Sequence, residues 1–211
     1  MPELFIADDG QPRCGWIAGA PDFYLAYHDD EWGRPVHGDH AVFERLCLEG
    51  FQSGLSWRTV LAKRENFRSA FAGFEIEAVA RFDEADVERL LGDAGIVRNR
   101  AKIEAVINNA GRAADLRAEV GDGALTELVW SYREGGRQAV DDRADAVWES
   151  RGSSPESAAL SKHLKRSGWR FVGPTTVYAC MQAMGMVNDH ASGCYVRAQA
   201  EAAQRGKAVR P

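Results

Sequence analysis

Four residues of the types that bind metal ions lie in two pairs, one near each end of the chain. Cys14 and His28 form the first pair, and His190 and Cys194 form the second. Two thiolates and two imidazoles can hold a zinc ion in a closed tetrahedral site. Such a site would join the first and last structured segments around one ion. Because four protein ligands leave no position for a substrate, we predict that this metal is structural.

The spacing within each pair leaves another interpretation open. Thirteen residues separate Cys14 from His28, which is more than a compact zinc knuckle has, and three separate His190 from Cys194. A lone buried cysteine or histidine more often packs in a core than binds a metal. Asp29 and Asp189 adjoin the two histidines and could orient their second ring nitrogens. Cys47 and Cys180 lie on apolar stretches, where we expect them in the core.

Length and composition narrow the class of protein. A chain of 211 residues can form one large domain or two small lobes with a substantial core. No apolar run approaches the roughly 20 residues that cross a bilayer, so we expect no membrane contact. The first residues lack the basic and apolar regions of a secretory signal. Together with four scattered cysteines, this predicts reduced thiols and a cytoplasmic location.

The charge distribution leaves a nucleic-acid partner possible. The net charge is −5, which alone disfavours nucleic acid, but residues 1–50 carry ten acids and three bases, and the rest of the chain therefore carries +2. Local basic patches attract phosphate whatever the total charge, although solvated helix faces are the other interpretation. The basic residues gather at Arg58, Lys63, Arg64 and Arg68, at Arg98, Arg100 and Lys102, and at Lys162, Lys165, Arg166 and Arg170.

Apolar residues recur at helical spacing along most of the chain, so we predict an all-α fold. The helices are expected to begin near Asp39, Ser56, Asp83, residue 100, residue 124, Ser154 and Pro174, most of them at residues that cap helices. Only residues 170–172 suggest an extended piece, and residues 135–153 suggest an irregular connection. We expect one helical domain over residues 13–196, with flexible tails at 1–12 and 197–211.

Residues 86–110 predict two helices joined by a short hairpin. The first helix would end near Leu91, Gly95 would allow a tight turn, and the second would begin near Asn99. Exposed N–H groups in such a turn suit a DNA phosphate, and the nearby basic residues would add charge. An ordinary corner between two helices is the alternative. The predicted DNA-binding residues are Gly95, Arg98, Arg100 and Lys102.

Glu49 ends an otherwise apolar helix face, so its carboxylate should be partly buried and in need of a hydrogen-bond partner. Trp57 follows after a turn, and further aromatic residues accompany the first ligand pair. Aromatic faces beside a buried acid suit a flat ring that carries amino groups, although the same rings could form a core. The candidate substrate-binding residues are Trp57, Trp16, Tyr24, Tyr27 and Trp32.

Several uncommon motifs in one order resemble the bacterial 3-methyladenine DNA glycosylase I family. The resemblance covers about residues 13–195. It implies a helix-hairpin-helix glycosylase fold, with one zinc ion on Cys14, His28, His190 and Cys194. It also implies that Glu49 recognises the flipped base, with Tyr27, Trp57 and Trp16 around it. The motifs are RCGW at 13–16, YHDDEWG at 27–33, LEGFQSGLSW at 48–57, KREN at 63–66, DAGI at 93–96, FVGPTT at 171–176 and VNDHASGC at 187–194.

The implied reaction is hydrolysis of the N-glycosidic bond of 3-methyladenine in double-stranded alkylated DNA, which leaves an abasic site. We expect a monomer without an organic cofactor and without a lyase step. Phe51 and Ser53 depart from the family member that served as reference, which leaves the fine substrate range open. Two alternatives remain: a zinc-stabilised DNA-binding module without catalysis, and a zinc hydrolase, which four protein ligands disfavour.

Overall fold

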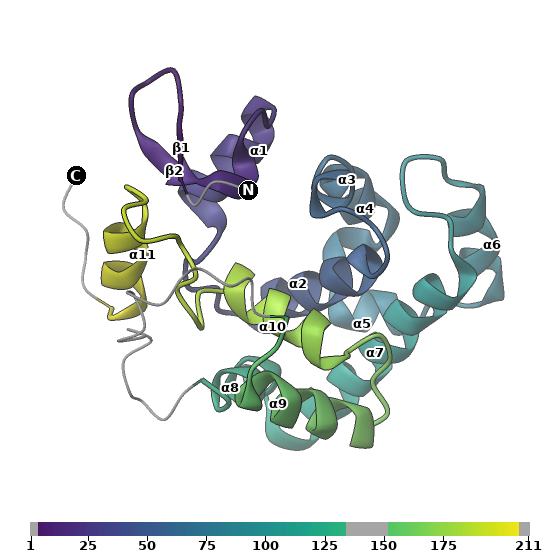
Figure 1. The fold of residues 1–211 in the computed structure, drawn as a ribbon. Helices are drawn as coiled ribbons and strands as arrows, with labels where there is room; N and C mark the ends of the chain where they lie inside the picture. Colours follow the sequence, from purple (N-terminus) through teal and green to yellow (C-terminus); the bar gives the residue numbers. More distant parts are fainter. Residues whose placement is uncertain (1–3, 134–151, 207–211) are drawn as a thin grey trace. The chain divides into compact units, whose positions relative to one another are not determined.

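The computed structural model describes residues 4–133 and 152–206 and contains two compact units. The first unit comprises Met1–Val36, Arg133–Gly152 and Met181–Pro211, and the second comprises His37–Tyr132 and Ser153–Cys180. Helices dominate the second unit, whereas the first combines short helical elements with a β-hairpin (Figure 1). The first is therefore assembled from both ends of the chain, as the paired metal ligands predicted.

A β-hairpin opens the first unit, where we expected a flexible tail and no strand. Strands β1 (Leu4–Ile6) and β2 (Pro12–Cys14) are antiparallel, with Leu4 opposite Cys14. The guanidinium of Arg13 donates to Asp9 at 2.8 and 2.7 Å and to Asp29 at 3.0 Å, and these bonds hold the hairpin. The chain as a whole is mostly helical, as predicted, but the loose segment that we expected over residues 1–12 includes strand β1 and the start of β2.

The other elements of the first unit are short. After β2 come a 3₁₀ turn, η1 (Gly15–Ile17), helix α1 (Asp22–Ala26) and a π-helical turn, η2 (Tyr27–Glu31). Helix α11 (Arg197–Gln204) occupies part of the second predicted tail. Its Ala200 is buried, and Gln204 donates to the carbonyls of Gly33 at 2.9 Å and Val187 at 3.0 Å. These contacts explain why this segment is ordered.

The second unit is built from helices and carries a large aromatic core. Helix α2 is buried along nearly all of its second half. Phe43, Phe51, Phe67, Phe71 and Phe74 are all fully buried. The elements are α2 (Asp39–Gln52), α3 (Trp57–Leu61), α4 (Arg64–Ala70), the 3₁₀ turn η3 (Ala72–Phe74), α5 (Ile76–Val79), α6 (Glu84–Gly92), α7 (Arg100–Val120), α8 (Ala124–Trp130) and α9 (Pro155–Arg166), and α10 (Pro174–Ala183) leads the chain from this unit back to the first (Figure 1).

Most of the predicted helix starts are confirmed, because their side chains satisfy the free N–H groups of a first turn. Ser56, Asp83 and Ser154 each accept a hydrogen bond from their own helix. Asp39 is the exception, since Gly38 takes the capping position of α2. The carboxylate of Asp39 instead accepts from the backbone of Gly123 and Thr126, each at 2.9 Å, and so caps α8.

Residues 170–172 form no strand; they make a bend in which Phe171 has a φ of +55°. This contradicts the predicted extended piece. The expected irregular connection at 135–153 lies almost wholly outside the described residues. No described helix combines the length and the apolar character that crossing a membrane would require.

Candidate functional site

The four predicted metal ligands converge in the first unit. Their ligand atoms all lie within 4.8 Å of one another, and all four residues are buried. The Sγ atom of Cys194 is 3.6 Å from Nε2 of His28 and 3.6 Å from Nδ1 of His190. The Sγ atom of Cys14 is 3.7 Å from the same His190 nitrogen. The tertiary structure therefore joins two pairs that are far apart in the sequence.

These distances fit a tetrahedral zinc site. Bonds of about 2.3 Å to sulfur and about 2.0–2.1 Å to nitrogen, at tetrahedral angles, place sulfur and nitrogen about 3.6 Å apart. The observed separations of 3.6 and 3.7 Å match this edge length. The donor set, two sulfurs and two imidazole nitrogens, is also one that zinc prefers. The cluster can therefore hold one metal ion, and four protein ligands would enclose it.

The second nitrogen of each histidine has a partner inside the first unit. Nδ1 of His28 lies 2.7 Å from Oδ1 of Asp29, as predicted. Nε2 of His190 lies 3.1 Å from the carbonyl of Trp32, and the carboxylate of Asp189 accepts from Gln182 at 2.7 Å. The observed partner of this nitrogen is thus a backbone carbonyl, where we had suggested Asp189. Both partners can fix the imidazole rings so that the other nitrogen faces the sulfurs.

The two sulfur atoms differ while no cation is bound, because the neighbouring Cys194 and burial raise the pKa of Cys14. The neighbouring Cys14 thiol and the two imidazoles hold the pKa of Cys194 well below its ordinary value. The backbone N–H of Ala191 donates to Sγ of Cys14 at 3.2 Å, which favours a thiolate there too once a cation is present. A thiolate is the form of cysteine that binds metals.

Aromatic residues enclose the cluster. The ring of Trp16 lies 5.3 Å from that of His28, and the ring of Trp32 lies 4.6 Å from that of His190, both edge to face. The two indoles also contact each other at 5.2 Å. In the first unit, Trp16 and Trp32 thus pack against the predicted metal ligands. Their positions near Cys14 and His28 in the sequence had not specified this contact.

Tyr24 and Tyr27, from the adjoining helical turns, present nearly parallel rings. Their centroids are 6.3 Å apart with an interplanar angle of 8°. Tyr27 is 2 % exposed, while Tyr24 is half-buried. Tyr24 also packs edge to face on Trp16 at 5.3 Å, so these rings continue the aromatic group around the cluster.

Glu49 is the most unusual ionisable residue of the second unit. Its side chain lies on α2 and is 4 % exposed. Within the described part of the chain, no hydrogen-bond partner reaches its Oε2 atom. Burial raises the pKa of Glu49 to about 8, and Arg45, one helical turn earlier, offsets only part of that rise. The carboxyl could therefore accept hydrogen bonds from a ligand, and a positively charged ligand would favour its ionised form.

The residues after Glu49 lead to the predicted stacking residue. Helix α2 ends at Gln52, exposed residues 53–56 follow, and Trp57 begins α3 half-buried. Phe51, which precedes this exposed segment, lies in the core. Its ring is 1 % exposed and packs on Phe67 at 4.6 Å and Phe71 at 5.8 Å. Its departure from the reference family member is therefore absorbed by the core, and Ser53 is exposed.

Lys102 has a different environment from the one we predicted. It is 8 % exposed, and Nζ donates to the carbonyls of Phe51 at 2.8 Å and Ser53 at 2.5 Å. It thereby closes the end of α2, and we remove it from the expected phosphate-binding group. Burial lowers the pKa of Lys102, which agrees with an ammonium held away from water. A small cavity of about 10 Å³ beside it has room for one water molecule at most.

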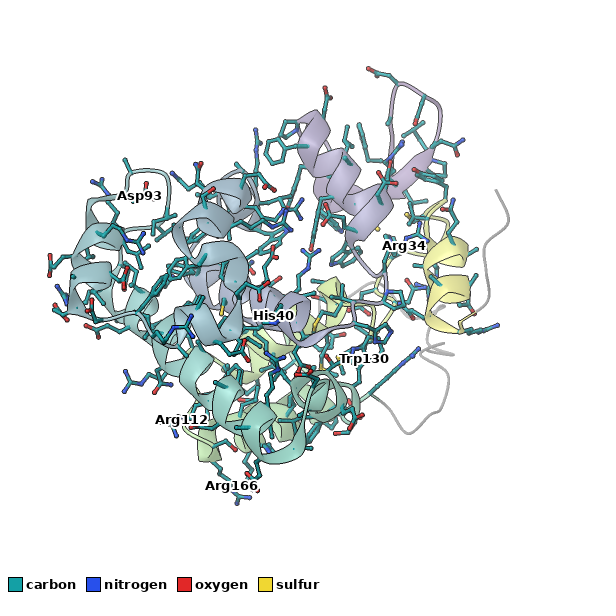
Figure 2. All side chains as sticks on the ribbon, turned by 180° about the vertical axis from the view of Figure 1, so that it is seen from behind. Arg34, His40, Asp93, Arg112, Trp130 and Arg166 are labelled. Atoms are coloured by element: carbon teal, nitrogen blue, oxygen red, sulfur yellow. The ribbon has the colours of Figure 1, made fainter. Side chains whose placement is uncertain are left out.

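The predicted hairpin is present between α6 and α7, and Asp93 marks its loop in Figure 2. The side chain of Asn99 caps α7 by accepting from the N–H of Lys102 at 3.1 Å. Arg98 is exposed, whereas Arg100 pairs with Glu84, Glu88 and Glu104. Three carboxylates compensate the charge of Arg100, so Arg98 is the better candidate for contact with an anion.

Two functional details were not predicted. Arg13 joins Asp29, which orients His28, to Asp9 in the first hairpin. Lys63 donates to the loop carbonyls of Ala94 at 2.9 Å and Gly95 at 3.2 Å. A lysine at residue 63 was visible as part of a basic group, but no sequence signal links it to a loop 31 residues away.

Known proteins resemble this chain over most of its length. The model of the methyladenine glycosylase family matches residues 16–198. DNA-3-methyladenine glycosylase 1 from Escherichia coli (strain K12) is 48% identical over 182 residues, 86% of this chain and 95% of that protein. DNA-3-methyladenine glycosylase from Haemophilus influenzae (strain ATCC 51907 / DSM 11121 / KW20 / Rd) is 42% identical over 86% and 96%. A crystal structure of 3-methyladenine DNA glycosylase I is similar with a TM-score of 0.78 and 44% identity, covering 87% of this chain and 98% of that one.

Proposed function

The chain belongs to the methyladenine glycosylase family, and from this premise we infer that it removes 3-methyladenine from DNA in base-excision repair. The reaction is hydrolysis of the N-glycosidic bond. The bond between C1′ and N9 breaks, its electron pair neutralises the cationic base, and water adds to C1′ and loses a proton. Free 3-methyladenine and an abasic site are the products.

We propose that Glu49 recognises the positive charge of the methylated base. The observation that carries this proposal is a carboxyl that is 4 % exposed, with an oxygen that has no hydrogen-bond partner in the described residues. Adenine methylated at N3 offers amino hydrogens and a positive charge, whereas normal adenine is neutral. Because Glu49 has a pKa of about 8, a bound cation would favour the ionised carboxylate and release a proton near pH 7.

Trp57 is the proposed stacking partner of the flipped base. It begins α3, eight residues after Glu49 and directly after the cap at Ser56. An indole face attracts a cationic ring more strongly than a neutral one, so Trp57 would add to the same selectivity. The leaving group is already cationic, and the protein need supply little acid catalysis. Trp16 and Tyr27 remain proposed substrate-binding residues on the strength of the family resemblance. Tyr24 and Trp32 remain proposed because they are aromatic residues close to them in the sequence.

The hairpin loop is the proposed contact with double-stranded DNA. Gly95 and exposed Arg98 are the residues we assign to the phosphate backbone, and Lys102 is left out because its ammonium binds carbonyls inside the protein. Extraction of the nucleotide costs a few kcal/mol of stacking, which backbone contacts must offset. We further propose that the enzyme is a cytoplasmic monomer that lacks a lyase step.

Cys14, His28, His190 and Cys194 are the proposed ligands of one structural zinc ion. Their sulfur–nitrogen separations near 3.6 Å support this ligand set. A bound zinc would supply fold stability, since its coordination would be complete. The chemical step is assigned to the pocket residues and to water.

The test is chromatography of the bases that the enzyme releases from alkylated DNA, with Glu49→Gln and Glu44→Gln compared. Both acids lie on α2, but Glu44 pairs with Arg68 at 2.9 Å. We expect 3-methyladenine release by the wild type and the Glu44 variant, and loss of release by the Glu49 variant. Full activity of Glu49→Gln would remove Glu49 from its role, and a wild type that binds abasic DNA without releasing base would indicate a non-catalytic module.

A further inference from the structure

The loop between α6 and α7 is held by a side chain from a neighbouring element, Lys63. This residue lies at the junction of α3 and α4. Its ammonium donates to the carbonyls of Ala94 at 2.9 Å and Gly95 at 3.2 Å, and the amide of Asn66 donates to the Gly95 carbonyl at 3.3 Å. Two successive loop carbonyls are therefore bound from one side.

The loop itself explains why these carbonyls need a partner. The N–H of Gly95 donates to Oδ1 of Asp93 at 2.7 Å, and the N–H of Ile96 donates to the Asp93 carbonyl at 3.4 Å. Asp93 thus closes a tight turn that leaves the carbonyls of Ala94 and Gly95 without partners in the turn. A Cβ atom at Gly95 would lie 3.2 Å from Cβ of Asn66, so glycine permits the close approach of α4.

The charge on Lys63 matters because the loop is the proposed contact with DNA. Carbonyl oxygens carry partial negative charge and would repel a phosphate, whereas N–H groups attract it. In the described part of the protein, the N–H groups of Val97 and Arg98 donate to no other group. The Lys63 ammonium therefore offsets the negative charge of the two carbonyls. The electrostatic potential that the loop presents to a phosphate is then positive.

We propose that Lys63 is a positioning residue for DNA binding, which fixes the hairpin loop and neutralises its carbonyls so that its N–H groups face a phosphate. The proposal rests on the proposed function, in which the hairpin contacts the DNA backbone. Lys63 lies six residues after Trp57. The same short segment therefore carries the proposed stacking residue and the side chain that holds the proposed DNA-binding loop.

The experiment compares Lys63→Met, Lys63→Arg and Lys162→Met in steady-state base release from alkylated DNA. Lys162 is an exposed lysine of α9 and controls for the loss of one positive charge. We expect Lys63→Met to raise KM for DNA about tenfold with little change in kcat, and Lys63→Arg to recover most of the loss. Lys162→Met should change KM less than twofold.

Two further measurements separate this inference from the proposed function. Inhibition by free 3-methyladenine reports the base pocket alone and should be equal in wild type and Lys63→Met. Amide hydrogen exchange at Gly95 and Ile96, whose N–H groups bond to Asp93, should be faster in Lys63→Met, because the loop has lost its partner. An unchanged KM for Lys63→Met with an active wild type would overturn the inference alone, as would an equal rise in KM for Lys162→Met. An inactive wild type would overturn the proposed function.

Discussion

The metal-ligand cluster and Glu49 are both buried and polar. They differ in their hydrogen bonds, because the protein supplies partners to the cluster but leaves one oxygen of Glu49 without a donor among the described residues. In the cluster, both second imidazole nitrogens have partners, at 2.7 Å for His28 and 3.1 Å for His190, and the ligand atoms face one another. Glu49 has an oxygen that no donor reaches among the described residues, and its pKa is raised to about 8.

In the function that we propose, the difference separates a site that holds the fold from one that binds the base. A buried polar group without a partner costs free energy, and a ligand that supplies the partner removes that cost. The cluster could hold one cation and would then have no free position. Glu49 would gain donors and positive charge from a cationic base, if it binds the base as proposed.

Removal of the metal should have the largest effect on stability. We expect Cys194→Ser to lower the free energy of unfolding by roughly 5 kcal/mol or more, because metal binding contributes directly to folding. Thermal unfolding with and without a chelator measures this. Turnover per folded molecule at low temperature should stay near that of the wild type. A variant of normal stability without turnover would instead indicate a catalytic metal, and the cluster would then not be a purely structural site.

Replacement of Glu49 should act in the opposite way. We expect Glu49→Gln to reduce kcat/KM for 3-methyladenine release about a hundredfold or more, because a neutral amide no longer favours a cationic base. The fold should not suffer at neutral pH, since the neutral amide replaces a carboxyl that is itself protonated below about pH 8 in the free protein. Circular dichroism and calorimetry of the variant check the fold, and a destabilised variant would show that Glu49 has a structural role like that of the cluster.

The dependence on pH should follow the raised pKa of Glu49. The folded state holds its proton up to about pH 8, against an ordinary pKa of 4.5, so the stabilising effect of the protonated form is complete below pH 4.5. It is lost as the pH rises from 4.5 to about 8, by about 5 kcal/mol in all. Urea unfolding between pH 5 and 9 should show this slope in the wild type and not in Glu49→Gln.

Activity should rise over the range in which stability falls. If the ionised carboxylate binds the base, kcat/KM increases with pH toward about 8 and then levels off. A flat profile in that range would mean that the charge of Glu49 does not enter recognition, which would weaken the contrast between the two regions.

The smallest effect should come from the residue that orients His28. We expect Asp29→Asn to weaken metal affinity about tenfold, because the partner of a ligand histidine sets its ring orientation and basicity. Asp189→Asn is the matched control, since its carboxylate accepts from Gln182 and not from His190. Competition with a chromophoric chelator measures both. Equal affinity in the two variants would show that the Asp29 contact is dispensable.

The sequence predicted features that depend on local chemistry. Ser56, Asp83 and Ser154 cap helices because their side chains satisfy N–H groups two or three residues away. The hairpin before α7 and the burial of Glu49 on an apolar helix face also follow from nearby residues. The β1–β2 hairpin was missed because a guanidinium pairs it with Asp29, sixteen residues beyond Arg13.

By itself, the sequence determined that the chain is mainly helical, which residue types could hold a metal, and that one carboxyl would be buried among apolar residues. Only the tertiary structure decided that Sγ of Cys14 lies 3.7 Å from Nδ1 of His190. The same is true of the hydrogen bonds from Lys102 to the carbonyl of Phe51 at the end of α2 and from Lys63 to the carbonyl of Gly95. Periodicity and capping act over a few residues and can be followed along the chain. The partner of a charged or ligating side chain depends on how distant segments pack, and the spacing of residues along the chain does not predict it.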